Sequence, residues 1–317
     1  MILPEDRYSF SGKKKQSRKP LVIILVSAIL VLAAAAAVFF LIKKIPEGKF
    51  LTAGADDEIT IEALWEKQHY DTINEKCEAI LLDDPMNQKA LVYNGFSYFY
   101  RGVSQFSLEE KIPLYDNALI NLRRALLVCN DDIKGKVKYI IGKSYFQKGK
   151  YYSDLAIKYL EESMEAGYTG EDTFEYLGLL FSRLGRYEQS IEYYQKALEE
   201  KPSDMLYLVL AQTYYQLGDK DSAEEYLIWS LDKTEDYSVE QKARYLLGNI
   251  LFENGEYLKA EEEYLKIIEK NDKAADAYFY LGNIYEKLGD IAKARFEWRK
   301  CLEIDSYHYG ARLKLYG

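Results

Sequence analysis

Histidines and paired carboxylates are the residues of this chain that could do catalytic chemistry, and they are sparse. The 317 residues include two histidines, His69 and His308, which lie far apart. This arrangement excludes most histidine-based catalytic triads and histidine-rich zinc sites. The paired acids Glu161-Glu162 and the run 261–263 fall within helical patterns, where a solvated face is the expected interpretation.

The three cysteines, Cys77, Cys129 and Cys301, are odd in number and show no CxxC spacing. Cys77 and Cys301 occupy apolar positions of helical patterns. Such cysteines behave as small buried hydrophobic residues. The sequence therefore predicts no disulfide framework and no metal site.

One short stretch, Gly142-Lys143-Ser144, resembles the end of a phosphate-binding loop. A complete loop needs a further glycine at position 137, where Val137 stands, and a preceding strand. Gly142 is also explained by the repeat described below. We therefore expect no nucleotide, no other cofactor and no enzymatic activity.

Charge is distributed unevenly along the chain, whose net charge is −9. Residues 1–50 hold nine basic and three acidic side chains, and the remainder holds 33 basic and 48 acidic. An acidic body would repel nucleic acid phosphates, so a nucleic acid partner is not expected. The acidity is typical of a soluble domain, and a basic protein partner is the alternative.

The segment Leu21 to Ile42 contains 22 residues without a charge. As a helix it would be about 33 Å long, enough to cross a hydrocarbon core of about 30 Å. The segment ends in two phenylalanines, Leu41 and Ile42, followed by Lys43-Lys44, which is not a small-residue cleavage site. We therefore predict an uncleaved transmembrane signal anchor at 21–42, with a cleaved signal peptide as the alternative.

The flanks of this segment predict its orientation. Six Lys/Arg precede it within a basic arm, residues 1–20, and three follow closely in a linker at 43–54. The positive-inside rule then places the N-terminus in the cytoplasm. In a bacterium, the protein would be a single-pass inner-membrane protein with a periplasmic domain. The opposite topology is the alternative.

The rest of the chain is organised around one recurring pattern, which is clearest at 276–304. There Tyr278-x2-Leu281-Gly282-x2-Tyr285 is followed by Gly289 and Ala294-x3-Trp298. This spacing is that of a helix, a tight turn and a second helix. The first helix of each pair is called helix A and the second helix B. Earlier copies are centred on Leu247-Gly248, Leu210-Ala211, Leu177-Gly178, Ile141-Gly142 and Gly95, and a degenerate first copy includes Leu64, Cys77 and Pro85.

These seven copies resemble the tetratricopeptide repeat (TPR) family. The resemblance implies an all-α, right-handed superhelical solenoid over about 55–317, preceded by the transmembrane helix. It also implies that helix A lines the concave side, and that the partners are proteins. Residues 309–317 are too short for another pair and are expected to extend a final helix over the last exposed face.

In the resembling family, peptide contacts come from helix-A positions one residue after the repeat glycine and three to four before it. Asn249 and Asn283 could each bond a peptide backbone, because an amide offers both a donor and an acceptor. Ordinary solvated residues are the alternative. The dicarboxylate clamp of some TPR domains is not in register, since Leu179 follows Lys143 by one unit. The candidate contact residues of this face are Asn249, Asn283, Gln212, Tyr245, Tyr215, Tyr139, Lys143 and Phe279.

Two segments depart from the repeat. Residues 103–111 form an insertion between helices A and B of the second unit, with Pro113 expected in the first turn of the next helix. Phe106 and Leu108 lie in this expected loop, where they either tuck back onto the solenoid or dock a partner. The second departure is a longer connection at 231–240.

These features predict a membrane-anchored scaffold that mediates protein–protein interactions in the assembly of a bacterial envelope machine. A flagellar, a secretion or an envelope-assembly system would fit equally. The alternative is a periplasmic, chaperone-like accessory factor that binds client polypeptides near the translocon.

Overall fold

The computed structural model of the protein describes residues 60–317. These residues form fifteen α-helices and one short 3-10 helix, with no strand among them. The expectation of an all-α fold is therefore confirmed for this part of the chain. The predicted arm, transmembrane segment and linker all fall within residues 1–59, outside the described residues. None of the helices in 60–317 is long and apolar enough to cross a membrane.

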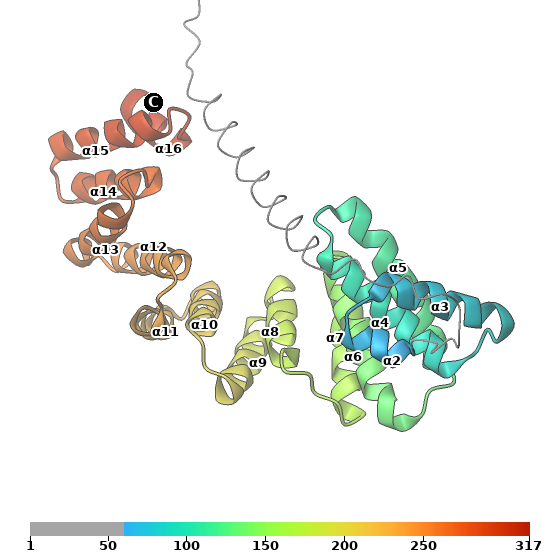
Figure 1. Ribbon diagram of the computed structural model, residues 1–317. Coiled ribbons are helices and arrows are strands. Elements are labelled where there is room, and N and C mark those ends of the chain that lie inside the picture. The colour runs from blue at the N-terminus through green and yellow to red at the C-terminus, as the bar shows by residue number, and fades with distance from the viewer. Residues whose placement is uncertain (1–59) are drawn as a thin grey trace, which may run out of the picture. The chain divides into compact units, whose positions relative to one another are not determined.

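Fourteen of the helices form seven helix–turn–helix pairs that follow one another along the ribbon (Figure 1). The 3-10 helix η1 (Lys150–Tyr152) precedes α7, and α16 (Tyr309–Tyr316) follows the last pair. In chain order the pairs are α2 (Ile61–Glu66) with α3 (Tyr70–Asp83), α4 (Gln88–Ser104) with α5 (Leu108–Ala125), α6 (Asp131–Gln147) with α7 (Ser153–Glu165), α8 (Thr173–Arg183) with α9 (Tyr187–Glu200), α10 (Asp204–Leu217) with α11 (Lys220–Lys233), α12 (Tyr237–Glu253) with α13 (Tyr257–Lys270), and α14 (Ala275–Lys287) with α15 (Ile291–Ile304).

Packing follows the order of the chain. The two helices of each pair are in contact, and each pair contacts the next. Helices A of successive pairs also touch, as α4 does with α6, α6 with α8, and α10 with α12. The fold is therefore built from interactions between near neighbours in sequence.

The close crossing of helices A and B depends on small residues, as the last pair shows. A Cβ atom built on Gly282 would lie 2.9 Å from Cε2 of Trp298 and closer still to its Nε1 and Cδ1. The indole of Trp298 thus occupies the space that the missing side chain leaves. Gly289 ends the turn region after α14 with φ +83°, a left-handed conformation that favours glycine.

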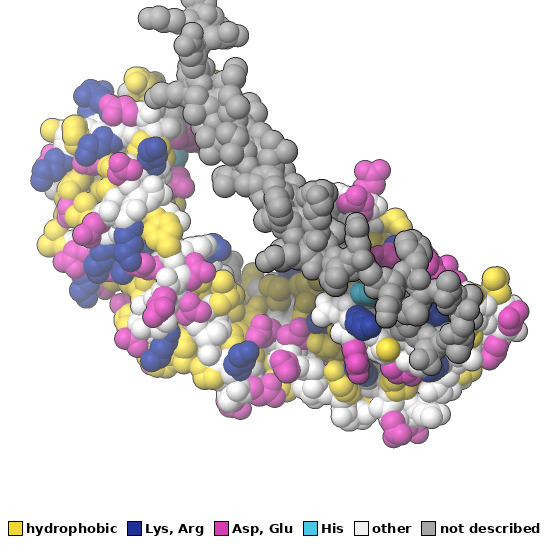
Figure 2. Space-filling model, in the orientation of Figure 1, with side chains coloured by type: hydrophobic (Ala, Val, Ile, Leu, Met, Phe, Trp, Pro, Cys, Tyr) yellow, Lys and Arg dark blue, Asp and Glu magenta, His cyan; other side chains and the backbone are white. Residues whose placement is uncertain are grey.

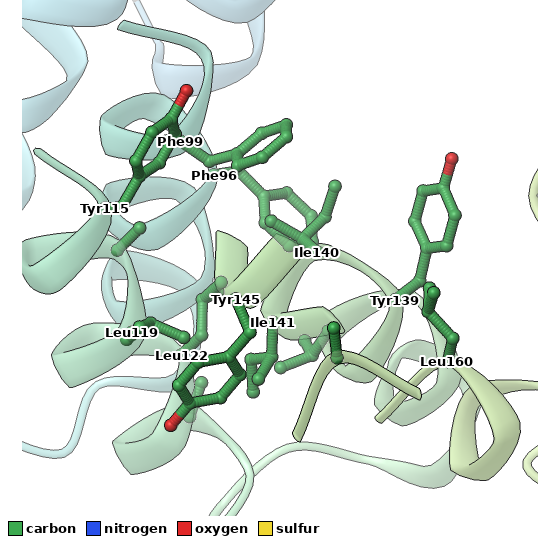
Figure 3. Close-up of a cluster of buried hydrophobic side chains, with 14 of the residues drawn as sticks. Phe96, Phe99, Tyr115, Leu119, Leu122, Tyr139, Ile140, Ile141, Tyr145 and Leu160 are labelled. Atoms are coloured by element: carbon green, nitrogen blue, oxygen red, sulfur yellow. The ribbon is translucent and has the colours of Figure 1, made fainter. Parts of the chain in front are cut away.

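The largest buried cluster joins α4, α5, α6 and α7 and extends into α8. In Figure 3, Leu119 and Leu122 of α5 lie beside Ile141 and Tyr145 of α6. Leu122 and Ile141 are fully buried. This cluster fastens the second pair to the third.

Tyr115 of α5 is fully buried, and its hydroxyl makes no hydrogen bond to any described residue. Burial raises the pKa of Tyr115 to about 12. A buried hydroxyl without a partner loses its hydration and gains nothing in return. The ring fills the core, but the oxygen destabilises it.

We therefore expect Tyr115→Phe to raise the free energy of unfolding, by about 1 kcal/mol. The measurement is urea denaturation followed by circular dichroism. Tyr264→Phe is the matched control, because the Tyr264 hydroxyl donates to Asn249 Oδ1 at 2.9 Å and its loss should destabilise. A Tyr115→Phe protein less stable than wild type would contradict the prediction.

The insertion at 103–111 is not a long loop, which corrects the expectation from the sequence. α4 continues to Ser104 and α5 begins at Leu108, so the connection contains only residues 105–107. Ser107 caps α5, its Oγ accepting from the backbone N–H of Glu110 at 3.2 Å. Pro113 lies at the sixth residue of α5 rather than in its first turn. The extra residues lengthen the two helices.

The expected long connection at 231–240 is likewise short. α11 ends at Lys233 and α12 begins at Tyr237, which leaves residues 234–236 between them. Asp236 caps α12, its Oδ1 accepting from the backbone N–H of Ser238 at 2.7 Å. The additional residues form the first turn of a 17-residue helix A.

The acidic run 261–263 is not wholly a solvated face, and the expectation is wrong at Glu263. That residue is buried, with its Oε2 2.6 Å from Nη1 of Arg244 on α12. Its Oε1 is 2.6 Å from Nζ of Lys266. The guanidinium of Arg244, on helix A of the same pair, therefore compensates the buried Glu263 carboxylate. The acidic run alone does not predict this ion pair.

The final helix α16 covers α15. His308 caps it, since Nδ1 accepts from the backbone N–H of Ala311 at 3.1 Å. Ala311 is fully buried and lies one 34-residue period after Ala277, which is also fully buried. α16 thus takes the place of a helix A on the last pair.

The three cysteines are buried free thiols. Burial raises the pKa values of the Cys77 and Cys301 thiols to about 12, which keeps both protonated. They pack as small apolar groups, as the sequence predicted.

Candidate functional site

A hollow of about 530 Å³ lies against helices α8, α10 and α12, the helices A of three successive pairs. Helix B contributes a single residue, Tyr194 of α9, to its lining. The lining residues are Leu179, Ser182, Tyr194, Val209, Gln212, Thr213, Tyr215, Gln216, Lys242, Tyr245, Leu246 and Asn249. The hollow is therefore formed mainly by the helices that the sequence assigned to the concave side.

Four of the predicted contact residues meet in this hollow: Gln212, Tyr215, Tyr245 and Asn249. Gln212 is exposed and the other three are half-buried. The Tyr215 hydroxyl donates to Glu253 Oε1 at 2.8 Å, and Lys220 Nζ lies 2.8 Å from the other carboxylate oxygen. The hydrogen bond to Glu253 holds the Tyr215 side chain in the lining of the hollow.

The chemistry of the hollow is nearly neutral. Among its twelve lining residues, Lys242 is the single charged side chain. The pKa of Tyr245 lies far above its ordinary value, mainly because the residue is buried, so its hydroxyl stays protonated. Amides, hydroxyls and aromatic rings can hydrogen-bond and stack against a ligand, but they supply no acid–base or nucleophilic pair.

Asn283, the equivalent of Asn249 one repeat later, is not part of the hollow's lining. Both asparagines bond to an aromatic residue of helix B in the same pair. Asn283 Oδ1 accepts from Nε1 of Trp298 at 3.3 Å, as Asn249 Oδ1 does from Tyr264. These amide oxygens are thus already engaged within the fold.

Tyr139 and Lys143 belong to an internal cluster at the junction of α6 and α8. Lys143 Nζ lies 2.7 Å from Asp172 Oδ2 and 3.1 Å from the Tyr139 hydroxyl. The Tyr139 hydroxyl also donates to Asp172. Lys143 further lies 4.8 Å from the centre of the Tyr176 ring. The cluster connects the third pair to the fourth. The polar groups of Tyr139 and Lys143 are therefore already bonded within the fold and are not available to contact a ligand.

Phe279 packs beneath the final helix. Its ring centre is 4.7 Å from that of His308, and a Cβ atom on Gly310 would lie within 2.6 Å of it. His308 Nε2 in turn lies 3.0 Å from Asp276 Oδ1. This position of helix A is therefore covered by α16.

Phe106 and Leu108 are exposed at the tip of the α4–α5 hairpin. Phe106 is 99% exposed and Leu108 is 69% exposed. They do not tuck back onto the solenoid, so that alternative is wrong. Leu108 is the first residue of α5 and lies outside the three-residue connection.

Several lining residues were not singled out from the sequence, among them Ser182, Gln216, Lys242 and Leu246. Their helical spacing from the predicted contact positions could have identified them. Each lies three, four or seven residues from the position that follows the repeat glycine or its alanine equivalent. Residues at such spacings share one face of a helix.

Acidic and basic side chains are interspersed on the face drawn in Figure 2, with hydrophobic areas between them. Many charged side chains of the described residues are paired, as Lys138 is with Glu162 at 3.1 Å. Within residues 60–317 no group of three or more His, Cys, Asp or Glu is arranged to hold a metal ion. The neutral hollow is the strongest candidate site in the described part of the chain.

Comparison with known families gives three matches to models described as tetratricopeptide repeat, over residues 172–204, 208–273 and 275–308. TPR repeat-containing protein MJ1428 of Methanocaldococcus jannaschii is 24% identical over 203 residues, which cover 59% of this chain and 34% of that protein. Tetratricopeptide repeat protein 21B of Xenopus laevis is 29% identical over 85 residues, covering 27% of this chain and 6% of that protein. The chain thus spans about a third or less of these relatives.

Two solved structures are similar in fold. The C-terminal part of a TPR repeat-containing protein from Cytophaga hutchinsonii aligns with a TM-score of 0.63 and 18% identity, covering 81% of this chain and 98% of that one. A structure of MamA protein aligns with a TM-score of 0.50 and 24% identity, covering 59% and 97%. The repeat matches and the helix pairs agree, and residues 172–204, 208–273 and 275–308 are similar to tetratricopeptide repeats.

Proposed function

We propose that the chain is a scaffold that holds an extended segment of a partner protein in the hollow formed by α8, α10 and α12. The observation that carries the proposal is the meeting of Gln212 and Tyr215 of α10 with Tyr245 and Asn249 of α12, on two successive helices A. Amide and hydroxyl groups can pair with a peptide backbone, and the tyrosine rings can cover apolar side chains. A nearly neutral wall suits a backbone better than a highly charged ligand.

The finer part of the proposal concerns the setting. The apolar segment 21–42 and its basic flanks support a membrane anchor, with the repeats on the periplasmic side of a bacterial inner membrane. A scaffold held there would join components of an envelope machine during its assembly. Flagellar, secretion and envelope-assembly systems remain equally suited. A chaperone-like factor that binds client polypeptides near the translocon is the second candidate.

Site-specific photo-crosslinking tests the hollow directly. A photoreactive phenylalanine analogue at Gln212, which is exposed within the hollow, is expected to capture a partner in cells. The same analogue at Glu225, exposed on α11 outside the hollow's lining, is the matched control. Equal capture from both positions, or capture from position 225 alone, would refute the proposed site.

The crosslinked products also separate the two candidate functions. A scaffold is expected to give a few partners in stoichiometric amounts, which co-purify with the full chain from membranes. A chaperone-like factor would give many weakly held clients. In co-purification of the chain without the analogue, Gln212→Ala combined with Asn249→Ala should reduce the recovery of either kind of partner. Lys287→Ala, at an exposed position of α14 outside the hollow, should not.

The topology makes a separate prediction. Alkaline phosphatase fused after Gly317 is expected to be active, and green fluorescent protein fused there to be dark, because the repeats lie outside the cytoplasm. Fusions after Pro20 should show the reverse. Fluorescence after Gly317 without phosphatase activity would establish the opposite topology.

A further inference from the structure

We infer that Trp298 and Tyr264 are positioning residues, which turn the amides of Asn283 and Asn249 so that each presents an N–H donor to the helix-A surface. This surface then recognises main-chain carbonyl oxygens of an extended polypeptide at intervals of one repeat. The inference rests on the proposed function and extends it by one repeat, because Asn249 lines the hollow and Asn283 lies on α14, the next helix A.

The argument is strongest at Asn283. The indole Nε1–H of Trp298 lies 3.3 Å from Asn283 Oδ1, and an indole nitrogen only donates. An amide nitrogen cannot accept that hydrogen bond, so Oδ1 must be the atom that faces α15. The Nδ2 group then points away from the indole, and it makes no hydrogen bond to a described residue.

Asn249 repeats the arrangement one period earlier. The Tyr264 hydroxyl donates to Asn249 Oδ1 at 2.9 Å, and Tyr264 is fully buried. In both pairs the aromatic residue follows the asparagine by 15 positions. The second pair therefore has the same geometry with a different aromatic donor.

The repeat glycine makes this contact possible. A Cβ atom on Gly248 would lie 2.7 Å from Cζ of Tyr264, just as one on Gly282 would collide with Trp298. The ring crosses helix A over the glycine and so reaches the next residue. The glycine, the asparagine and the helix-B aromatic residue form one unit.

The unit is specific to the last two pairs, which shows that it is not a requirement of the fold. In the fourth pair Tyr194 lies over Gly178 in the same way, but Leu179 follows that glycine and has no amide. In the third pair Leu160 takes the aromatic position beside Gly142. In these two pairs no amide donor is held in this way after the repeat glycine.

A fixed donor restricts the ligand. A free asparagine can turn its amide and pair with either a carbonyl or an N–H group. With Oδ1 engaged on the helix-B side, Nδ2 can pair only with an acceptor. The carbonyl oxygens of an extended chain supply acceptors at a regular spacing along the surface.

The first test needs no ligand. The chain contains three tryptophans, so its indole N–H resonances are few enough to assign by substitution. In the full-length ¹⁵N-labelled chain, Asn283→Leu is expected to shift the Trp298 indole resonance and speed its solvent exchange at least about threefold, because one hydrogen bond is lost. Asn249→Leu is the control and should leave this resonance in place. An unmoved resonance in Asn283→Leu would overturn the positioning.

The second test measures binding of a defined probe, a blocked, charge-free pentapeptide of alternating serine and valine. Asn283→Asp keeps an oxygen for the indole but replaces the outward N–H donor with an acceptor. We expect it to retain the indole resonance and to bind the probe at least about fivefold more weakly, the loss of one hydrogen bond. Wild-type affinity in Asn283→Asp would overturn the donor role.

Trp298→Phe removes the indole donor and keeps an aromatic ring. It is expected to weaken binding of the probe by about two- to fivefold in the wild-type background. In the Asn283→Ala background it should have no further effect on binding. Equal effects in both backgrounds would show that Trp298 acts only on stability. Failure of the wild-type chain to bind the probe would refute the donor role and the proposed groove together, whereas an unmoved indole resonance refutes the positioning alone.

Discussion

Replacing Leu122 with alanine is expected to lower the free energy of unfolding by about 2–5 kcal/mol. Leu122 is fully buried in the cluster that fastens α5 to α4 and α6 (Figure 3). The truncation removes the transfer free energy of the deleted carbons and leaves a cavity that helices on both sides can close only in part. Amide hydrogen exchange in α4, α5 and α6 measures the loss where it occurs.

Leu127→Ala is the matched control for this variant. It makes the same chemical change five residues later, at a side chain that is 77% exposed. A change within about 0.5 kcal/mol is expected there. Similar losses from the two variants would show that the Leu122 side chain is not part of a packed core.

Gly282→Leu should cost about 1–3 kcal/mol through overpacking. The first added carbon already lies too close to Trp298, which is itself 3% exposed and cannot withdraw into solvent without leaving the core. The crossing of α14 and α15 would have to widen, and α16 would lose part of its support. Hydrogen exchange in α14–α16, compared with α4–α7, measures this local effect.

Lys287→Leu adds the same side chain to α14 at an exposed position and should change stability little. If Gly282→Leu were as stable as this control, the glycine would not be needed for the close approach of the helices. The repeat spacing would then need another physical explanation.

The sequence predicted the helix pairs well because their signal is local. A small residue on helix A and a large one 16 positions later describe a single crossing, as at Gly282 and Trp298. Helix ends in unusual segments were predicted less well. At 103–111 the Ser107-x-x-Glu110 pattern is an N-cap that begins a helix. The sequence analysis missed this cap because it assigned the whole segment to an insertion.

The candidate site was predicted only in part, for a reason that concerns contacts between pairs. Gln212, Tyr215, Tyr245 and Asn249 meet because equivalent helix-A positions align from one pair to the next. Lys143 occupies an equivalent position but is held by Asp172, which lies 29 residues further along the chain. The repeat pattern specifies the position of a residue on helix A. Contacts with the neighbouring pair determine whether its side chain can contact a ligand.

The dependence of each pair on its neighbours has a consequence for how the molecule can be observed. The stability of such an array is the sum of contributions from single pairs and from the interfaces between neighbouring pairs. Its two ends can therefore unfold independently. The three tryptophans stand on α2, α11 and α15, near the beginning, in the later middle and near the end of the array. Trp298 is buried while Trp229 is 40% exposed. Single-tryptophan variants would therefore act as built-in fluorescent reporters of where unfolding begins.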